Sequence, residues 1–240
     1  MDHLKGAEQI FRYLNKCPSL WIKLDPSVHK PTEDLIDPTL QEVDWTSYYP
    51  DAFDPVDPKA PKPQGVPLTS AVYFDSNWAH DKLTCRSTTS LVGFIGNTPV
   101  TWSSKRQGAI ATSTYSAELT AVKVGTEEAV SLRYMLHYLG VPLASFGDST
   151  KACPTLLVGD NLGALVSGSD PGSECQKHHV AIAYHYVREC HAAGIVSLKK
   201  IHTSKNPTER TERINTHNGR VSQSYFTKKV SEIKRKSVFV

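Results

Sequence analysis

The stretch AVYFD, residues 71–75, is a short apolar run that ends in the carboxylate of Asp75. A second run of this kind, TLLVGD at residues 155–160, ends in Asp160. Between the two runs, Glu118 lies near the start of a long helical pattern. The ends of two strands and the start of a helix converge on one point if the strands are neighbours and the helix packs across them. These three carboxylates are therefore the first candidates for a functional site.

Three carboxylates at one point repel each other, because like charges a few Å apart disfavour joint ionisation. A bound cation relieves this repulsion, and hard oxygen ligands suit Mg²⁺ or Mn²⁺. Two such ions roughly 3.5–4 Å apart are a common device for cleaving phosphodiesters. The residue pattern alone therefore predicts a metal-dependent nuclease.

The composition narrows the class of protein. A chain of 240 residues has room for one large domain, or for one domain with a substantial flank. It contains no run of 18 apolar residues, and its first residues lack the basic-then-apolar layout of a signal peptide. The five cysteines are widely scattered and form no CxxC pair, so we expect neither a zinc site nor a disulfide framework. We expect an intracellular protein, cytoplasmic or nuclear, that binds no membrane.

Charge is distributed unevenly along the chain. Residues 199–240 hold 11 Lys and Arg against 3 Glu, a balance of +8, whereas residues 1–198 carry −5. A basic C-terminal segment is what a polyanion-binding surface needs. The alternative interpretation of the same segment is a disordered, solvated tail.

The periodicity of apolar residues predicts the secondary structure. A helix is expected over residues 4–14, after which residues 25–70 contain nine prolines and many Asp. Prolines at this density block helix interiors and sheet ladders, so this region is predicted to be an extended linker. Its aromatic residues are candidate anchors: Trp45, Tyr48, Tyr49 and Phe53.

The compact domain is predicted to begin near residue 70. Its expected strands cover residues 71–75, 89–95, 99–103, 155–159 and 195–201, with a hairpin turn at Gly96-Asn97. Its expected helices run from Ser113 or Thr114 to Gly140, over residues 161–167, and over residues 176–193. Residues 168–174 are expected to form a loop. Hairpins followed by α-β crossovers give an α/β fold, a five-stranded mixed β-sheet flanked by α-helices with a Pro-rich N-terminal extension.

Several local motifs occur together in this order. They read AVYFDSNWAHDK from residue 71, RSTTS from 86, WSSKRQ from 102, TSTYSAEL from 112, GDNLGA from 159 and QKHHVAIAYHYVRE from 176. In this order they resemble the ribonuclease H domain of copia-type retrotransposons. The segment IFRYL, residues 10–14, resembles the helix at the end of the polymerase region that precedes this domain. The resemblance covers residues 3–24 and 71–209.

The resemblance implies a function and a set of site residues. Asp75, Glu118 and Asp160 would hold two Mg²⁺ ions, with Mn²⁺ as the alternative, and the substrate would be the RNA strand of an RNA–DNA hybrid. The residues expected to contact the nucleic acid are Lys105, Arg106, Asn161, Lys177 and His178. Taken singly, Glu118 reads as an ordinary first-turn helix acid and Asp160 as the N-cap of the following helix.

The sequence departs from the family at its fourth carboxylate. The family segment reads Asn-Leu-Ala-Asp, then two apolar residues, then Thr-Lys, and the text here is NPTERTE from residue 206. In this alignment Glu209 is the fourth catalytic acid and metal ligand. In an alternative alignment YFTK, residues 225–228, ends the segment, Ser224 replaces the acid, and residues 208–223 are an insertion. Either alignment weakens one metal site.

Four parts are therefore expected: residues 1–24 from the end of the polymerase region, a linker at 25–70, the nuclease domain at 71–207 and a basic tail at 208–240. The chain looks like a piece of a retrotransposon polyprotein, with the element's polymerase region as a partner and a virus-like particle as its setting. Three functions stay open: a ribonuclease acting on RNA–DNA hybrids, a catalytically decayed nucleic-acid-binding fragment, and another polynucleotidyl transferase of the same fold, such as an integrase-like or resolvase-like enzyme.

Overall fold

The computed structural model forms two compact units, Ile22–Thr211 and a unit of Met1–Trp21 with Glu212–Val240. The structure describes residues 8, 11, 12, 15, 24, 25, 27, 35–39, 44–54, 57–81, 83–143, 154–175 and 180–208. In the smaller unit, the described residues are helical and lie within or just after the helix expected at residues 4–14, and Phe11 there is 69% exposed. All sheet strands belong to the larger unit.

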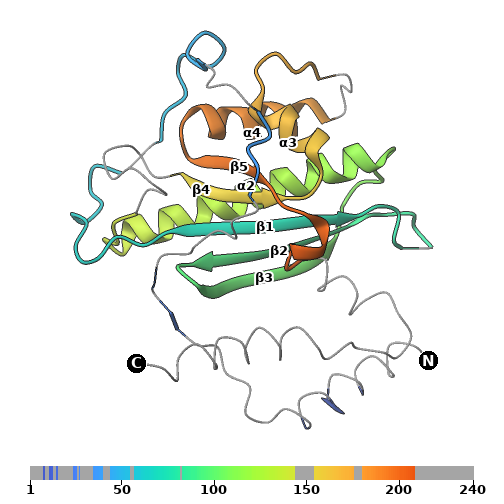
Figure 1. Ribbon diagram of the computed structural model, residues 1–240, viewed down its shortest axis with the longest axis horizontal. Helices are drawn as coiled ribbons and strands as arrows, with labels where there is room; N and C mark the ends of the chain where they lie inside the picture. The colour runs from blue at the N-terminus through green and yellow to red at the C-terminus, as the bar shows by residue number, and fades with distance from the viewer. Residues whose placement is uncertain are drawn as a thin grey trace. The chain divides into compact units, whose positions relative to one another are not determined.

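The larger unit contains a five-stranded sheet in the order β3-β2-β1-β4-β5 (Figure 1). Its strands are β1 (Ser70–Asn77), β2 (Thr88–Ile95), β3 (Thr98–Arg106), β4 (Thr155–Gly159) and β5 (Val196–Lys200). The pairs β1–β2 and β2–β3 are antiparallel, and the pairs β1–β4 and β4–β5 are parallel. This is the five-stranded mixed sheet that the sequence predicts, and this part of the predicted fold class is confirmed.

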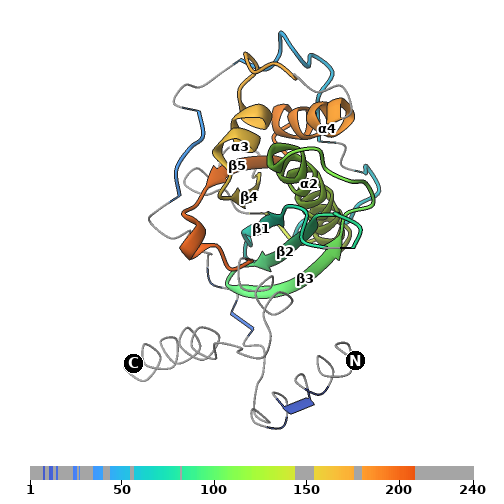
Figure 2. The same cartoon turned by 90° about the vertical axis from the view of Figure 1, so that its right-hand side faces the viewer.

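Three helices of the described chain cover one face of this sheet (Figure 2). They are α2 (Thr114–Tyr138), α3 (Leu162–Ser169) and α4 (Ala181–Ala192), and a short 3₁₀ helix, η2 (Thr203–Lys205), follows β5. No helix in the described part of the chain combines the length and the apolar character needed to cross a bilayer.

The strands form as expected because their side chains alternate between two apolar layers. On the helix side, Phe74, Leu157 and Leu198 pack with buried residues of the three helices. On the other face, Tyr73 and Val158 form a smaller cluster with Ile201. Burial in this cluster raises the pKa of the Tyr73 phenol to about 12. Because both faces of the central strands are apolar, β1 and β4 read as continuous hydrophobic runs in the sequence.

Turns and caps fix the ends of these elements. Gly96 adopts φ +55° in the turn between β2 and β3, where a left-handed residue is needed. The side chain of Ser113 accepts a hydrogen bond from the Ser116 N–H at 3.2 Å and so caps α2. Gly140, with φ +66°, follows the last residues of α2 and ends the helix, as predicted.

Two expectations about the third helical segment are wrong. Asn161, not Asp160, is the N-cap of α3, since its side chain accepts from the Ala164 N–H at 3.1 Å. The helix also runs through Gly168 to Ser169, where a loop is expected, because Gly168 packs tightly beneath α4 and β5. A Cβ at this position would lie 2.9 Å from Val187 and 3.0 Å from Leu198.

The described parts of residues 25–70 lie against the domain. Asp54 forms an ion pair with Arg133 of α2 at 2.5 Å, and both side chains are mostly buried. Trp45 lies 5.4 Å from the guanidinium of Arg188, a buried residue of α4. Tyr49, another of the aromatic anchors expected from the sequence, contacts α4 as well, through a 2.8 Å hydrogen bond between its hydroxyl and the ring of His185. The expected anchors Tyr48 and Phe53 are instead 54% and 71% exposed.

Candidate metal centre

Three carboxylates from three elements meet at one edge of the sheet. Asp75 comes from β1, Glu118 from α2, and Asp160 directly follows β4. One ligand oxygen of each lies within 4.8 Å of the other two. Asp75 and Glu118 are 7% and 8% exposed, and Asp160 is half-buried. Among the described residues, this is the one group of His, Cys, Asp and Glu side chains arranged closely enough to hold a metal ion.

The register of the parallel strands brings the two aspartates together. Tyr73 of β1 is paired with Val158 of β4, so Asp75 and Asp160 each lie two residues beyond the last paired position. The ring of Phe74 lies directly over Gly159, where an added Cβ would be 2.3 Å from the ring. Gly159 thus permits the two strand ends to approach each other. The residue after Phe74 is Asp75, and the residue after Gly159 is Asp160.

Glu118 reaches the aspartates because α2 packs against both β1 and β4. Its position in the helix is not the first turn, as the sequence suggests when Glu118 is considered alone, since α2 begins at Thr114 and has no acid in its first turn. The side chain of Gln107 anchors this end of the helix. Its amide nitrogen donates to the carbonyl of Ala117 at 3.0 Å and to the hydroxyl of Thr89 at 2.9 Å.

Hydrogen bonds orient two of the three carboxylates. Oδ1 of Asp75 accepts from the backbone N–H of Ser76 at 2.8 Å. Oδ2 of Asp160 accepts from the hydroxyl of Thr203, the first residue of η2, at 2.7 Å. The side chains of Asp75 and Asp160 are therefore held in defined orientations.

The donor set fits a hard divalent cation. Carboxylate oxygens are preferred ligands of Mg²⁺. The three ligand oxygens lie within 4.8 Å of one another, close enough for these carboxylates to share a bound cation. Without a cation, three like charges with two of them buried would repel strongly.

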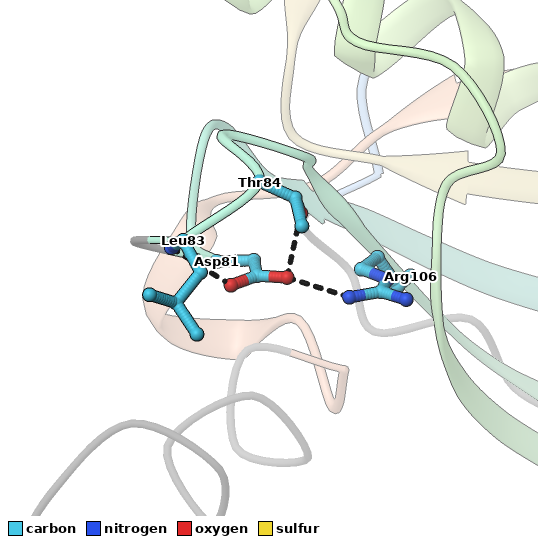
Figure 3. A network of polar contacts seen from close by, with 4 residues as sticks. All are labelled: Asp81, Leu83, Thr84 and Arg106. Atoms are coloured by element: carbon cyan, nitrogen blue, oxygen red, sulfur yellow. Dashed lines mark hydrogen bonds and ion pairs between the residues drawn. The ribbon is translucent and has the colours of Figure 1, made fainter.

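The predicted phosphate contacts at the end of β3 lie in different settings. Lys105 is exposed. Arg106 forms an ion pair with Asp81 in the loop after β1, with Nη1 and Oδ2 separated by 2.7 Å (Figure 3). Hydrogen bonds from Thr84, together with the Arg106 guanidinium, hold the pKa of Asp81 well below its usual range. Arg106 thus ties β3 to this loop, and half of its side chain stays exposed.

Of the other predicted site residues, one lies beside the centre and three lie outside the described residues. Asn161 uses its side-chain oxygen to cap α3 beside Asp160. Lys177, His178 and the fourth predicted acid, Glu209, lie outside the described residues. The metal and nucleic-acid roles assigned from the sequence therefore remain predictions, and the structure adds the proximity of the first three acids.

Sequence reasoning missed three residues that build this site. Gln107, Thr203 and Asn206 hold the start of α2, the Asp160 carboxylate and the end of β1. Gln107 is the last residue of a quoted motif, which was the available signal. Asn206 opens the quoted segment NPTERTE, which aligns with the Asn of the family segment. Thr203 lies in a polar stretch after β5, where no pattern of apolar residues identifies it.

Comparison with known proteins places these motifs among transposon polyproteins. The chain is 27% identical over 171 residues to the retrovirus-related Pol polyprotein from transposon RE2 of Arabidopsis thaliana, which covers 71% of this chain. It is 30% identical over 141 residues to the corresponding RE1 polyprotein of the same plant, and 23% identical over 142 residues to that of transposon TNT 1-94 of Nicotiana tabacum. Each of these two matches covers 59% of this chain. The chain spans about a tenth of the length of these curated relatives.

Solved structures with a similar arrangement include ribonuclease H domains. The N-terminal RNase H domain of rv2228c from Mycobacterium tuberculosis matches 62% of this chain and 94% of its own, with 11% identity and a TM-score of 0.45. RNase H1 from the archaeon Halobacterium salinarum matches 58% of this chain and 90% of its own, with 15% identity and a TM-score of 0.41. No protein-family model matches the chain. The sequence relatives confirm the predicted resemblance to copia-type retrotransposon polyproteins.

Proposed function

We propose that this chain, whose homologues are the Pol polyproteins of copia-type retrotransposons, is a metal-dependent nuclease of the ribonuclease H type. Its substrate is the RNA strand of an RNA–DNA hybrid. The observation that carries the proposal is the convergence of Asp75, Glu118 and Asp160, with their ligand oxygens within 4.8 Å of one another. The two structural roles that the sequence offers for these acids do not account for the convergence, because Asn161 caps α3 and Glu118 lies beyond the first turn of α2.

Each residue at the centre has a separate proposed role. Asp75, Glu118 and Asp160 would hold two Mg²⁺ ions, which when bound would supply an activated water and charge stabilisation for the leaving 3′ oxygen. Thr203 and the backbone N–H of Ser76 keep two of these carboxylates oriented. Because Asp160 is only half-buried, this side of the centre is open to solvent and to a phosphodiester. Manganese is the alternative metal, since it accepts the same oxygen ligands.

The described residues just before the candidate fourth acid are fixed in place. Asn206 and Thr208 are 2% and 0% exposed, and the amide of Asn206 donates to the carbonyl of Phe74 at 2.9 Å. The residue before Glu209 is therefore bound beside the strand that carries Asp75. Glu209 stays the proposed fourth ligand on its match to the family segment, and Ser224 stays the alternative.

Cleavage of a labelled RNA–DNA hybrid tests the proposal. The parent should cleave the RNA strand with Mg²⁺ and not in EDTA, and Asp160→Asn should abolish cleavage while hybrid binding is retained. A matched control is Glu128→Gln, which removes a charge from the same helix as Glu118, well away from the cluster. Cleavage by Asp160→Asn at the parent's rate would refute the assignment.

Glu209→Gln tests the fourth acid in the same assay, with a fall in rate of about 10²-fold or more expected, as for removal of a transition-state charge stabiliser. A folded parent that binds hybrid in a salt-dependent way without cleaving it would instead identify the decayed, binding-only fragment. Cleavage of DNA junctions or DNA strand transfer would identify another transferase of this fold. We further propose that the domain acts beside its element's polymerase region, inside the cell.

A further inference from the structure

The segment after β5 turns back across the ends of β4 and β1. The backbone N–H of Ile201 donates to the carbonyl of Gly159 at 2.8 Å, and the hydroxyl of Thr203 donates to Asp160 at 2.7 Å. The amide of Asn206 then donates to the carbonyl of Phe74. We call residues 201–208 the clasp, the orange-red segment that follows β5 in Figures 1 and 2. The clasp joins the two strand ends that carry the aspartates of the metal centre.

Local hydrogen bonds make the clasp a fixed structure. The ring nitrogen Nδ1 of His202 accepts from the backbone N–H of Ser204 at 3.3 Å and caps η2. Further along, the side-chain oxygen of Asn206 accepts from the backbone N–H and the hydroxyl of Thr208, at 3.1 Å and 2.6 Å. A segment fixed at both ends can hold the Thr203 hydroxyl in one place, although Thr203 itself is exposed.

We propose that Thr203 is a positioning residue for the Asp160 carboxylate, and that it tunes the affinity of the centre for its divalent cation. The inference rests on the proposed function, because it takes Asp160 as a metal ligand. A hydroxyl that engages Oδ2 restricts rotation of the carboxylate, which keeps the group aligned with Asp75 and Glu118. Hydrogen-bond partners of metal ligands commonly change metal affinity or activity by 10–100-fold.

The competing explanation is that Thr203 only stabilises the fold. The different burial of Asn206 and Thr203 distinguishes this role from the positioning role. Asn206 is fully buried in the clasp, so its hydrogen bonds serve the stability of the fold. Thr203 is exposed, and water can replace its hydroxyl as a donor to Asp160. Loss of the hydroxyl should therefore leave folding almost unchanged and act on the orientation of the metal ligand.

The test compares Thr203→Val, which removes the hydroxyl at nearly constant volume, with Thr203→Ser, which keeps it. Mn²⁺ and Mg²⁺ binding is measured by titration calorimetry, with no substrate present. We expect Thr203→Val to bind the cation about 10-fold more weakly than the parent and Thr203→Ser to bind within about twofold of it. Melting temperatures in EDTA should agree among all three proteins.

Cleavage of the hybrid adds a second readout. The cleavage rate of Thr203→Val should fall at limiting Mg²⁺ and recover at saturating Mg²⁺. The substitution should therefore raise the Mg²⁺ concentration needed for half of the maximal rate and leave the maximal rate unchanged. Equal metal affinity in Thr203→Val and the parent would overturn the proposal, as would a lower melting temperature of Thr203→Val in EDTA. If the parent binds metal through Asp160 but cleaves no hybrid, the proposed function fails while the role of Thr203 stands. If the parent binds no metal, both fail.

Discussion

The close approach of three carboxylates predicts that removing one of them stabilises the metal-free protein. In Asp75→Asn, the amide keeps an oxygen that can accept the Ser76 N–H now bound by Asp75 Oδ1. The substitution therefore changes the charge of the cluster with little change in volume or hydrogen bonding. Metal-free Asp75→Asn should unfold at a higher temperature than the parent, which is the reverse of the usual effect of a substitution at a buried position.

The expected size follows from the geometry. Two unit charges 4.8 Å apart repel by about 3.5 kcal/mol at an effective dielectric constant of about 20. Asp75→Asn removes two of the three repulsive pairs, which at this largest separation amount to about 7 kcal/mol before any relaxation or screening. Screening by solvent at half-buried Asp160 relieves much of this repulsion in the parent. We expect about 2 kcal/mol of net stabilisation, which raises the melting temperature of a domain of this size by about 4–8 °C.

Magnesium should reverse the order of the two proteins. A ligand that binds only the folded state stabilises it by about 2.7 kcal/mol at a concentration one hundred times its Kd. The parent should gain this stabilisation and Asp75→Asn should gain little of it, because a ligand is lost. Differential scanning calorimetry with and without Mg²⁺, at constant ionic strength set with NaCl, measures both effects. Glu128→Gln is the control for a general change in net charge.

Two results would refute this reasoning. If metal-free Asp75→Asn melts below the parent, the three acids do not repel in the folded state as their separation implies. If Mg²⁺ raises the melting temperatures of the parent and the variant equally, the cation acts elsewhere on the protein and the cluster is not its site.

Three further predictions concern the frame around the site. Asp54→Asn should lower the free energy of unfolding by about 3 kcal/mol, because it leaves the charge of buried Arg133 without its carboxylate partner, and a urea titration beside the double variant with Arg133→Met measures the coupling. Gly159→Ala should cost about 1–3 kcal/mol and weaken metal binding, because the new Cβ displaces the ring of Phe74 and separates the strand ends; unchanged calorimetric titrations would contradict this. Since the pKa of Tyr73 is raised to about 12 in the folded protein, its contribution to stability is complete below pH 10 and is lost between pH 10 and 12, so Tyr73→Phe should lose less stability than the parent when urea titrations are compared across that range.

The sheet could be predicted from the sequence because its strands follow simple rules. The run of residues 71–75 is apolar on both faces, and its neighbours are a hairpin and a second buried run, which leaves few topologies. The strand at 155–159 is observed with the predicted bounds. The third strand extends beyond its predicted end, through Arg106, because pairing with β2 continues over polar residues that periodicity does not identify.

Local rules failed where two residues compete for one role. Asp160 and Asn161 are both good N-caps, and the geometry selects Asn161, which leaves the aspartate free of the helix. The position of Glu118 was similarly ambiguous, because a helix that opens at Ser113 or Thr114 places it in the first or second turn. The structure thus excludes the N-cap role for Asp160 and the first-turn role for Glu118. This strengthens the interpretation of both carboxylates as metal ligands.

The residues of the metal centre can be predicted from the sequence more readily than those of the clasp. Each acid lies within or directly after an element that the apolar pattern predicts, so its position in space can be inferred from the fold. Thr203 and Asn206 act on atoms of residues 43 and 132 positions earlier, through a polar turn with no periodicity. Their contacts become recognisable only when the strand ends are placed in space, although Asn206 itself opens the quoted segment NPTERTE. It follows that the structure contributes most by identifying the residues that orient the acids, because the acids themselves can be predicted from the sequence.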